Sequence, residues 1–149
     1  AVGHGNKQGY GRRPAIIVVD VNYNFVGDKP EPILDSIRGH RLSCGEEGWE
    51  GVHQIQRLLG VARSKEIPIF YSTAPRDRNV LDAGRWAGKS PLSVQDRLQD
   101  IGNAGNEIVR DIAPQEGDIV IYKSKPSVFF GTSLISYLTE LQVDTLLVA

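Results

Sequence analysis

Continuous apolar runs alternate along the chain with segments in which apolar residues recur at helical spacing. The first run, "PAIIVV", is mostly β-branched and ends at Asp20. Two later runs, "IPIFYST" and "GDIVIYK", have the same character, and "DTLLVA" begins a fourth at the end of the chain. Short, continuously apolar runs are typical of strands that are buried on both faces of a parallel sheet. We therefore predict four such strands.

The segments between these runs predict helices and long surface loops. The stretch "WEGVHQIQRLLGVARSKE" places apolar residues on one side of a helix and charged residues on the other. The apolar set consists of Val52, Ile55, Leu58, Leu59 and Ala62. Weaker helical patterns cover residues 92–101 and 106–112, and "TSLISYLTELQV" predicts a short helix before the last strand. Residues 25–47 and 74–91 are rich in Gly, Pro and polar residues, which predicts loops.

Strand and helix alternate along the chain, which predicts an α/β fold, a doubly wound parallel sheet with helices on both faces. One domain, residues 1–149, accounts for this pattern. The last strand ends with the chain at Ala149, although a loop and a helix normally cover a parallel strand that is buried on both faces. Either the 149 residues lack the C-terminal part of the domain, or something else completes the sheet.

Composition and charge narrow the classes of partner. With 149 residues, 40% of them hydrophobic and 23% charged, the chain has an ordinary globular composition. The formal net charge of -1 provides no overall field that would attract nucleic acid or an acidic membrane. No apolar run approaches the roughly 20 residues that a membrane span needs. These features predict a soluble, cytoplasmic protein with no nucleic-acid or membrane partner.

Cysteine and histidine are too sparse for several kinds of site. Cys44 is the only cysteine, which excludes an internal disulfide and a cysteine-rich metal site. No pattern near Cys44 marks a base for it, so we interpret it as a structural or incidental thiol. His4, His40 and His53 lack the spacing of metal ligands. The glycine-rich "GNKQGYG" precedes a strand instead of joining strand to helix, which argues against a phosphate-binding loop.

Ionisable side chains stand where the predicted strands end. Asp20 follows the first strand. The second strand ends with Ser72 and Thr73 and is followed by Arg76, and Lys123 ends the third strand. Because ligands bind at the C-terminal ends of the strands in open α/β sheets, we expect Asp20 and Lys123 to lie at one functional edge. A coupled acid and base with catalytic roles would explain the pair. A structural ion pair explains the same pattern, because buried charges must be paired in either case.

Five segments, in this order and at these spacings, resemble the isochorismatase-like cysteine hydrolases. They are "PAIIVVDVNYNF", "IPIFYST", "DAGRWAGKSP", "GDIVIYKSKPSVFFGTSL" and "LQVDTLLVA". The resemblance covers the chain from about Gly9 to Ala149, and K-x-x-x-S-x-F-F-G-T is its most specific part. Within the family, the branch around N-carbamoylsarcosine amidohydrolase is the one that these segments resemble most.

The resemblance implies an active site of one aspartate, one lysine and one cysteine on a doubly wound parallel sheet. Asp20 matches the family's aspartate and Lys123 its lysine. In the family, the aspartate accepts the thiol proton and later activates water, while the lysine holds charge beside it and helps keep the thiolate. The family's cysteine follows the fourth strand, so we expect the nucleophile beyond Ala149, and Cys44 does not match it. The 149 residues alone are then expected to be inactive.

The resemblance also implies properties of the pocket. Related nicotinamidases carry a metal site with histidines after the second strand, whereas "STAPRDRN" contains none, so we expect no metal and no cofactor. Phe25, Trp86 and Phe129 are expected to wall the substrate pocket, with packing as the alternative role for Phe25 and Trp86. Arg76 is expected to meet a substrate carboxylate or to form a salt bridge within its loop.

Three functions are compatible with these residues. The leading one is hydrolysis of a C–N bond in a small amide or carbamoyl compound, by a homodimer or homotetramer as the resemblance implies. The second is isochorismatase-type hydrolysis of a vinyl ether, in which the aspartate acts as the acid and no thiol is needed. The third is a non-catalytic role as an oligomeric binding protein.

Overall fold

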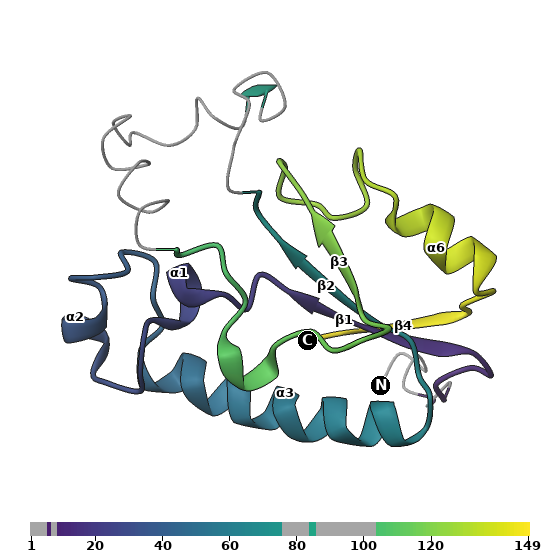
Figure 1. The fold of residues 1–149 in the computed structure, drawn as a ribbon, viewed down its shortest axis with the longest axis horizontal. Helices are drawn as coiled ribbons and strands as arrows, with labels where there is room; N and C mark the ends of the chain where they lie inside the picture. The colour runs from purple at the N-terminus through teal and green to yellow at the C-terminus, as the bar shows by residue number, and fades with distance from the viewer. Residues whose placement is uncertain (1–5, 7–8, 76–83, 86–103) are drawn as a thin grey trace.

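The computed structural model describes residue 6 and residues 9–75, 84–85 and 104–149 (Figure 1). Within these residues, four strands form one parallel sheet in the order β3-β2-β1-β4. The strands are β1 (Pro14–Val19), β2 (Ile69–Thr73), β3 (Ile119–Tyr122) and β4 (Thr145–Val148). Each lies within one of the four apolar runs, so the predicted strands are confirmed.

Helices cover both faces of this sheet, because successive residues of a strand point to opposite faces. Ile16 and Val18 belong to the apolar cluster that includes α3 (Glu46–Ser64). Ile17 belongs to the second cluster, together with α6 (Leu134–Glu140). In Figure 1, α3 runs below the sheet and α6 lies on its other side. The predicted doubly wound α/β fold is therefore confirmed.

The amphipathic helix is confirmed in α3, with one exception on its apolar side. Val52, Leu59 and Ala62 are buried against the sheet, and Ile55 is partly buried. Leu58 is exposed. Consecutive helical residues are separated by about 100° around the axis, so Leu58 and Leu59 do not both face the core.

The connection between β1 and α3 is more ordered than the predicted loop of residues 25–47. It includes the short helices α1 (Tyr23–Val26) and α2 (Ile33–Ser36). The buried hydroxyls of Ser36 and Ser43 lie 2.8 Å apart and form a hydrogen bond inside this connection. Gly27 has a φ of +84°, and a Cβ at this position would collide with the Ser36 hydroxyl. Glycine is therefore required where the chain passes these hydroxyls.

The helical prediction for residues 106–112 is wrong. Only a 3-10 turn, η2 (Arg110–Ile112), forms there. Ile108 makes an isolated antiparallel bridge with Asn22, and the backbone N–H of Tyr23 donates to the Glu107 carbonyl at 3.2 Å. These pairings with the chain after β1 fix an extended backbone, which overrides a weak local helical pattern. The other weak helical pattern, residues 92–101, lies outside the described residues.

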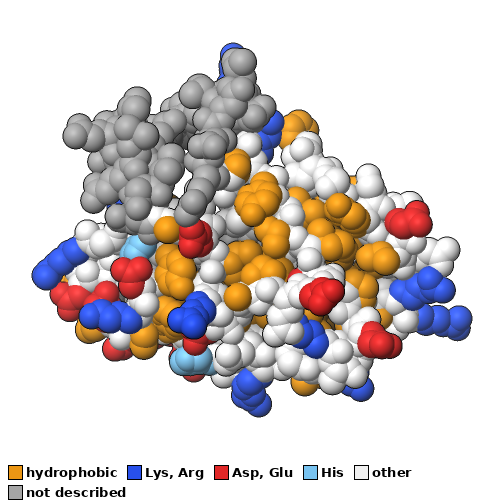
Figure 2. All heavy atoms as spheres, viewed as in Figure 1, with side chains coloured by type: hydrophobic (Ala, Val, Ile, Leu, Met, Phe, Trp, Pro, Cys, Tyr) orange, Lys and Arg blue, Asp and Glu red, His pale blue; other side chains and the backbone are white. Residues whose placement is uncertain are grey.

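Among the described residues, no helix combines the length and apolar character needed to span a membrane. Figure 2 shows one face of the molecule, on which acidic and basic side chains are interspersed around apolar ones. This mixture agrees with the formal net charge of -1. No single sign of charge dominates that face.

A carboxylate fastens the start of β1 to the start of β4. The Asp144 side chain accepts hydrogen bonds from the backbone N–H groups of Arg12 at 2.8 Å and Arg13 at 3.1 Å. The Asp144 N–H in turn donates to the Arg13 carbonyl at 3.1 Å. These bonds immediately precede the first paired residues of the two strands, Pro14 and Thr145. Asp144 therefore helps to set the register of β1 against β4.

The same hydrogen bonds make the effect of Asp144 dependent on pH. The N–H of Arg12, followed by that of Arg13, lowers the pKa of the Asp144 carboxyl below its ordinary value of 3.8. A lowered pKa means that the charged carboxylate stabilises the fold above the ordinary value and that this contribution is lost as pH falls through the folded-state pKa.

We expect Asp144→Asn to lower the melting temperature at pH 7, because an amide accepts hydrogen bonds less well than a carboxylate. The difference from the unaltered protein should shrink as the pH falls below about 4. Thermal unfolding of both proteins from pH 7 to pH 3 measures it. A difference that stays constant over that range would contradict the assigned role of the charge.

Candidate active site

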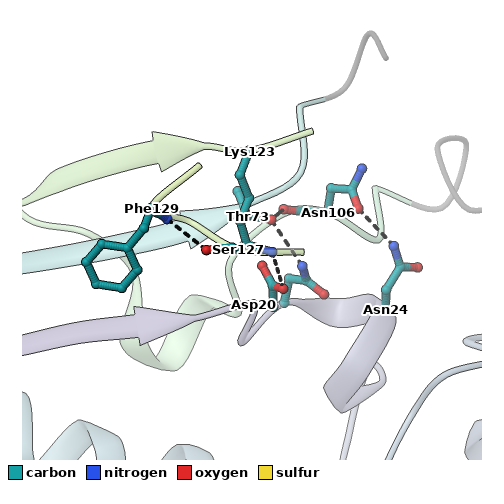
Figure 3. Close-up of polar contacts among 8 residues, drawn as sticks. Asp20, Asn24, Thr73, Asn106, Lys123, Ser127 and Phe129 are labelled. Atoms are coloured by element: carbon teal, nitrogen blue, oxygen red, sulfur yellow. Dashed lines mark hydrogen bonds and ion pairs between the residues drawn. The ribbon is translucent and has the colours of Figure 1, made fainter. Parts of the chain in front are cut away.

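The C-terminal ends of β1, β2 and β3 bring Asp20 and Lys123 together. The backbone N–H of Asp20 donates to the Ser72 carbonyl and the N–H of Lys123 to the Thr73 carbonyl, both at 2.9 Å. The strand pairing is thus continued by one residue on each side of β2. The Lys123 Nζ lies 2.6 Å from the Asp20 Oδ2 (Figure 3). The expectation that these two side chains lie at one edge of the sheet is met.

This ion pair is largely withdrawn from water. The Lys123 side chain is 7% exposed and that of Asp20 is 26% exposed. A buried ammonium is costly unless it is paired, so the carboxylate is what allows a lysine at this position. The second carboxylate oxygen, Asp20 Oδ1, is buried and has no hydrogen-bond partner among the described residues. One oxygen of Asp20 therefore holds the lysine, and the other is available as an acceptor.

Asp20 also has an unusual backbone. Its φ is +57°, in the left-handed region that few residues other than glycine adopt. Aspartate and asparagine tolerate this region better than β-branched residues do. The Asn22 N–H donates to the Asp20 carbonyl at 2.9 Å, which closes a tight turn directly after β1. Strained backbone that the surrounding structure holds in place is concentrated at functional sites.

A buried polar network adjoins the ion pair. The Asn22 Nδ2 donates to the Thr73 Oγ1 at 3.1 Å, and the Thr73 hydroxyl donates to the Asn106 carbonyl at 2.6 Å. The Asn106 side chain accepts from the Asn24 Nδ2 at 3.0 Å. Figure 3 shows this network next to Asp20 and Lys123. Thr73 was placed at the end of its strand by the sequence, but the links to Asn22 and Asn106 were not predicted.

The other predicted site residues are placed less uniformly. Phe25 on α1 is 39% exposed and Phe129 is 49% exposed. In Figure 3 the Phe129 ring lies beyond Ser127 and points away from the ion pair. The structure therefore does not enclose the ion pair with the Phe129 ring. Arg76 and Trp86 lie outside the described residues.

A cavity of about 650 Å³ lies beside the ion pair but not over it. Its lining includes Thr73, Pro75, Asn106 and Tyr122, and it contains neither Asp20 nor Lys123. Only Thr73 and Asn106 join the cavity to the network described above. We centre the candidate site on the ion pair, because acid–base chemistry needs the ionisable groups themselves.

Across the described part of the chain, no three or more His, Cys, Asp or Glu side chains are grouped so that they could hold a metal ion. The expectation of a metal-free site stays a prediction, because part of the stretch after β2 lies outside the described residues.

The chain thus has a parallel α/β sheet with a buried lysine and a carboxylate at the C-terminal edge of its strands, where open α/β sheets bind their ligands. Residues 14–149 match the isochorismatase domain family. The chain belongs to this family.

Individual relatives agree with this assignment. The chain is 34% identical over 146 residues to N-carbamoylsarcosine amidase of an Arthrobacter species, which covers 94% of this chain and 49% of that protein. It is 26% identical to maleamate amidohydrolase of Pseudomonas putida, which covers 97% of this chain and 62% of that protein. The chain therefore spans about half to three fifths of the length of these two relatives.

The fold is also similar to that of a solved structure of an isochorismatase-like hydrolase. The crystal structure of an isochorismatase-like hydrolase from Alkaliphilus metalliredigens superposes with a TM-score of 0.69 at 23% identity. That match covers 93% of this chain and 66% of the other. At this level of identity the likeness concerns the fold alone.

We expect the contributions of Lys123 and Asp20 to folding stability to depend strongly on each other. Lys123→Met leaves Asp20 without its cation, and Asp20→Asn leaves a buried ammonium without its anion. Each change should cost about 1–3 kcal/mol, less than a fully buried pair because Asp20 is a quarter exposed.

A double-mutant cycle tests this coupling. The variant that combines Lys123→Met with Asp20→Asn should lose less stability than the sum of the two single losses, because it leaves no unpaired charge. Urea unfolding of the four proteins at pH 7 gives the comparison. Additive losses would mean that the 2.6 Å contact contributes nothing specific.

Proposed function

We propose that the complete protein is a cysteine-dependent hydrolase that cleaves a C–N bond in a small amide or carbamoyl compound. The observation that carries the proposal is the buried contact of 2.6 Å between Lys123 and Asp20 at the edge where α/β sheets bind ligands. Membership of the isochorismatase domain family supports it. The names of two relatives, an amidase and an amidohydrolase, favour amide chemistry over vinyl ether hydrolysis.

In this proposal Asp20 is the general base. Its Oδ2 is held by Lys123, while its Oδ1 has no partner among the described residues and can accept the proton of a thiol. The resulting thiolate attacks the carbonyl carbon of the substrate. Asp20 gives the proton to the departing nitrogen, so that the C–N bond breaks, amine or ammonia leaves and a thioester remains. Water then attacks the thioester, which releases the acid and the cysteine sulfur. Asp20 removes a proton from that water in the second step.

Lys123 has an electrostatic role in the same cycle. Its ammonium lies against the carboxylate and keeps a positive charge at a site that must stabilise a thiolate. Its burial strengthens this effect, because charges interact more strongly away from water. An exposed lysine would contribute far less.

We place the nucleophilic thiol outside residues 1–149. Cys44 does not stand in the position of the family's cysteine, and it is exposed between α2 and α3. The residues described above then form part of one hydrolase domain. We also propose that the protein forms a homodimer or homotetramer, which analytical ultracentrifugation of the full-length protein would measure.

In the full-length protein, Asp20→Asn and Lys123→Ala should each reduce turnover of the best amide or carbamoyl substrate by about a hundredfold or more. The first removes the general base, and the second removes the cation that stabilises the thiolate. Ammonia release from a panel of such compounds provides the assay. Asp111→Asn and Lys65→Ala, which change exposed residues of the same types, are the matched controls and should keep turnover unchanged. Near-normal rates in either site variant would sink the assignment.

Thiol dependence can be separated from the thiol of Cys44. Iodoacetamide should abolish turnover of the full-length Cys44→Ser variant as fully as that of the unaltered protein, since the reacting cysteine is another residue. Loss of turnover in the Cys44→Ser variant before any reagent is added would instead identify Cys44 as the nucleophile. Turnover of a vinyl ether substrate that survives complete alkylation in both proteins would instead favour vinyl ether hydrolysis by Asp20, which needs no thiol.

Turnover should not depend on a metal ion. The stretch "STAPRDRN" offers no histidine after β2, and the proposed steps use only the carboxylate, the ammonium and a thiol. Dialysis against a chelator should therefore leave turnover unchanged. A loss of turnover that zinc restores would show that the site does use a metal.

A further inference from the structure

Thr73, the last residue of β2, is hydrogen-bonded to the backbone of Lys123 and to the side chain of Asn22, close to Asp20. Its carbonyl accepts the backbone N–H of Lys123 at 2.9 Å, which anchors the point where the lysine leaves β3. Its hydroxyl accepts the side-chain amide of Asn22 at 3.1 Å, two residues after Asp20. Thr73 is 3% exposed, so these contacts are made away from water.

The contact with Asn22 acts on the turn that holds Asp20. The Asn22 N–H donates to the Asp20 carbonyl, while the Asp20 N–H donates to the Ser72 carbonyl of β2, both at 2.9 Å. Asp20 is therefore held on both sides in its left-handed conformation, with a φ of +57°. The Asn22 side chain, itself 1% exposed, ties the far side of that turn back to β2 through the Thr73 hydroxyl.

The same hydroxyl also has its proton committed. It donates to the Asn106 carbonyl at 2.6 Å. The segment around Asn106 is fixed in turn to the chain after β1, because the Asn24 N–H donates to the Gly105 carbonyl at 2.8 Å. One hydroxyl thus joins β2, the turn after β1 and the segment before η2. Its donor and its acceptor are both used, which a hydroxyl can do and a methyl group cannot.

We propose that Thr73 is a positioning residue for the Asp20–Lys123 pair, acting through its hydroxyl on the turn that carries Asp20 and through its carbonyl on Lys123. The described hydrogen bonds of Thr73 go neither to the Asp20 carboxylate nor to the Lys123 ammonium. The expected effect of Thr73 on the reaction rate rests on the proposed function, whereas its expected effect on the geometry of the ion pair does not. A shift of the carboxylate by about 1 Å can reduce a catalysed rate by about a hundredfold.

Thr73→Val tests the proposal, because valine keeps the shape and suits a strand while it removes both hydrogen bonds of the hydroxyl. Thr73→Ser keeps the hydroxyl and serves as the conservative variant. Ile69→Val, at the opposite end of β2, is the control for a general loss of packing in the strand. Asn22→Ala breaks only the bond to Asn22 and replaces Thr73→Val if the latter does not fold.

Two measurements on the full-length protein decide the matter. Crystal structures of the variants give the distance from Lys123 Nζ to Asp20 Oδ2, which is 2.6 Å here. Steady-state kinetics on the best amide or carbamoyl substrate give kcat and KM separately. We expect Thr73→Val to lengthen the distance and to lower kcat by about tenfold to a hundredfold with KM within about twofold. Thr73→Ser should keep both the distance and kcat close to those of the unaltered protein.

Other outcomes overturn one proposal or the other. An unchanged Nζ to Oδ2 distance in Thr73→Val, or a kcat no lower than that of Ile69→Val, would show that the Thr73 hydroxyl does not position the ion pair. If the unaltered protein hydrolyses no amide or carbamoyl compound, the proposed function fails. The distance in the variants then still decides whether Thr73 positions the pair.

Discussion

The contact between the Lys123 ammonium and the Asp20 carboxylate constrains the rest of this structure. The two residues follow strands that are not neighbours, because β2 lies between β1 and β3. Adjacent strands are about 4.8 Å apart, so the two chains are separated by roughly 10 Å at this edge. A long side chain is needed to cross the end of β2, and lysine provides both the length and the charge. The register of all three strands must be correct before the 2.6 Å contact can form.

The site departs from what stability alone would favour. A buried ammonium, a left-handed aspartate and a buried carboxylate oxygen without a partner among the described residues stand together at one strand end. Natural proteins accept such local costs where chemistry requires them and offset them elsewhere. Here the offset comes from the two apolar clusters, in which strand residues such as Ile16 and Ile17 are almost completely buried. The packed sheet keeps the left-handed Asp20 and the buried ion pair in place, which the turn alone would not do.

The sequence predicted the parts of this fold that local pattern determines. The four apolar runs became strands because their β-branched residues suit a sheet covered on both faces, and α3 followed its helical spacing. Residues 106–112 did not follow theirs, because the Ile108 backbone pairs with Asn22 across a long sequence separation. Such a pairing leaves no periodic signal.

The candidate site divides in the same way. Asp20 and Lys123 could be placed together from the rule that parallel strands end at one edge. The links from Thr73 to Asn22 and Asn106 could not, because a single hydroxyl or amide carries no indication of which distant partner it will meet. Phe129 was expected beside the ligand, but its ring points away from the ion pair in Figure 3.

The left-handed backbone of Asp20 has a consequence for how this site can evolve. A φ of +57° disfavours β-branched and bulky residues regardless of what their side chains would do. Asparagine and glycine suit this backbone best, but either one at position 20 leaves the buried Lys123 ammonium without its anion, so we expect a change of Asp20 to be accompanied by a change of Lys123. In a family tree, paired changes at positions 20 and 123 would therefore mark lineages that kept the fold without this ion pair.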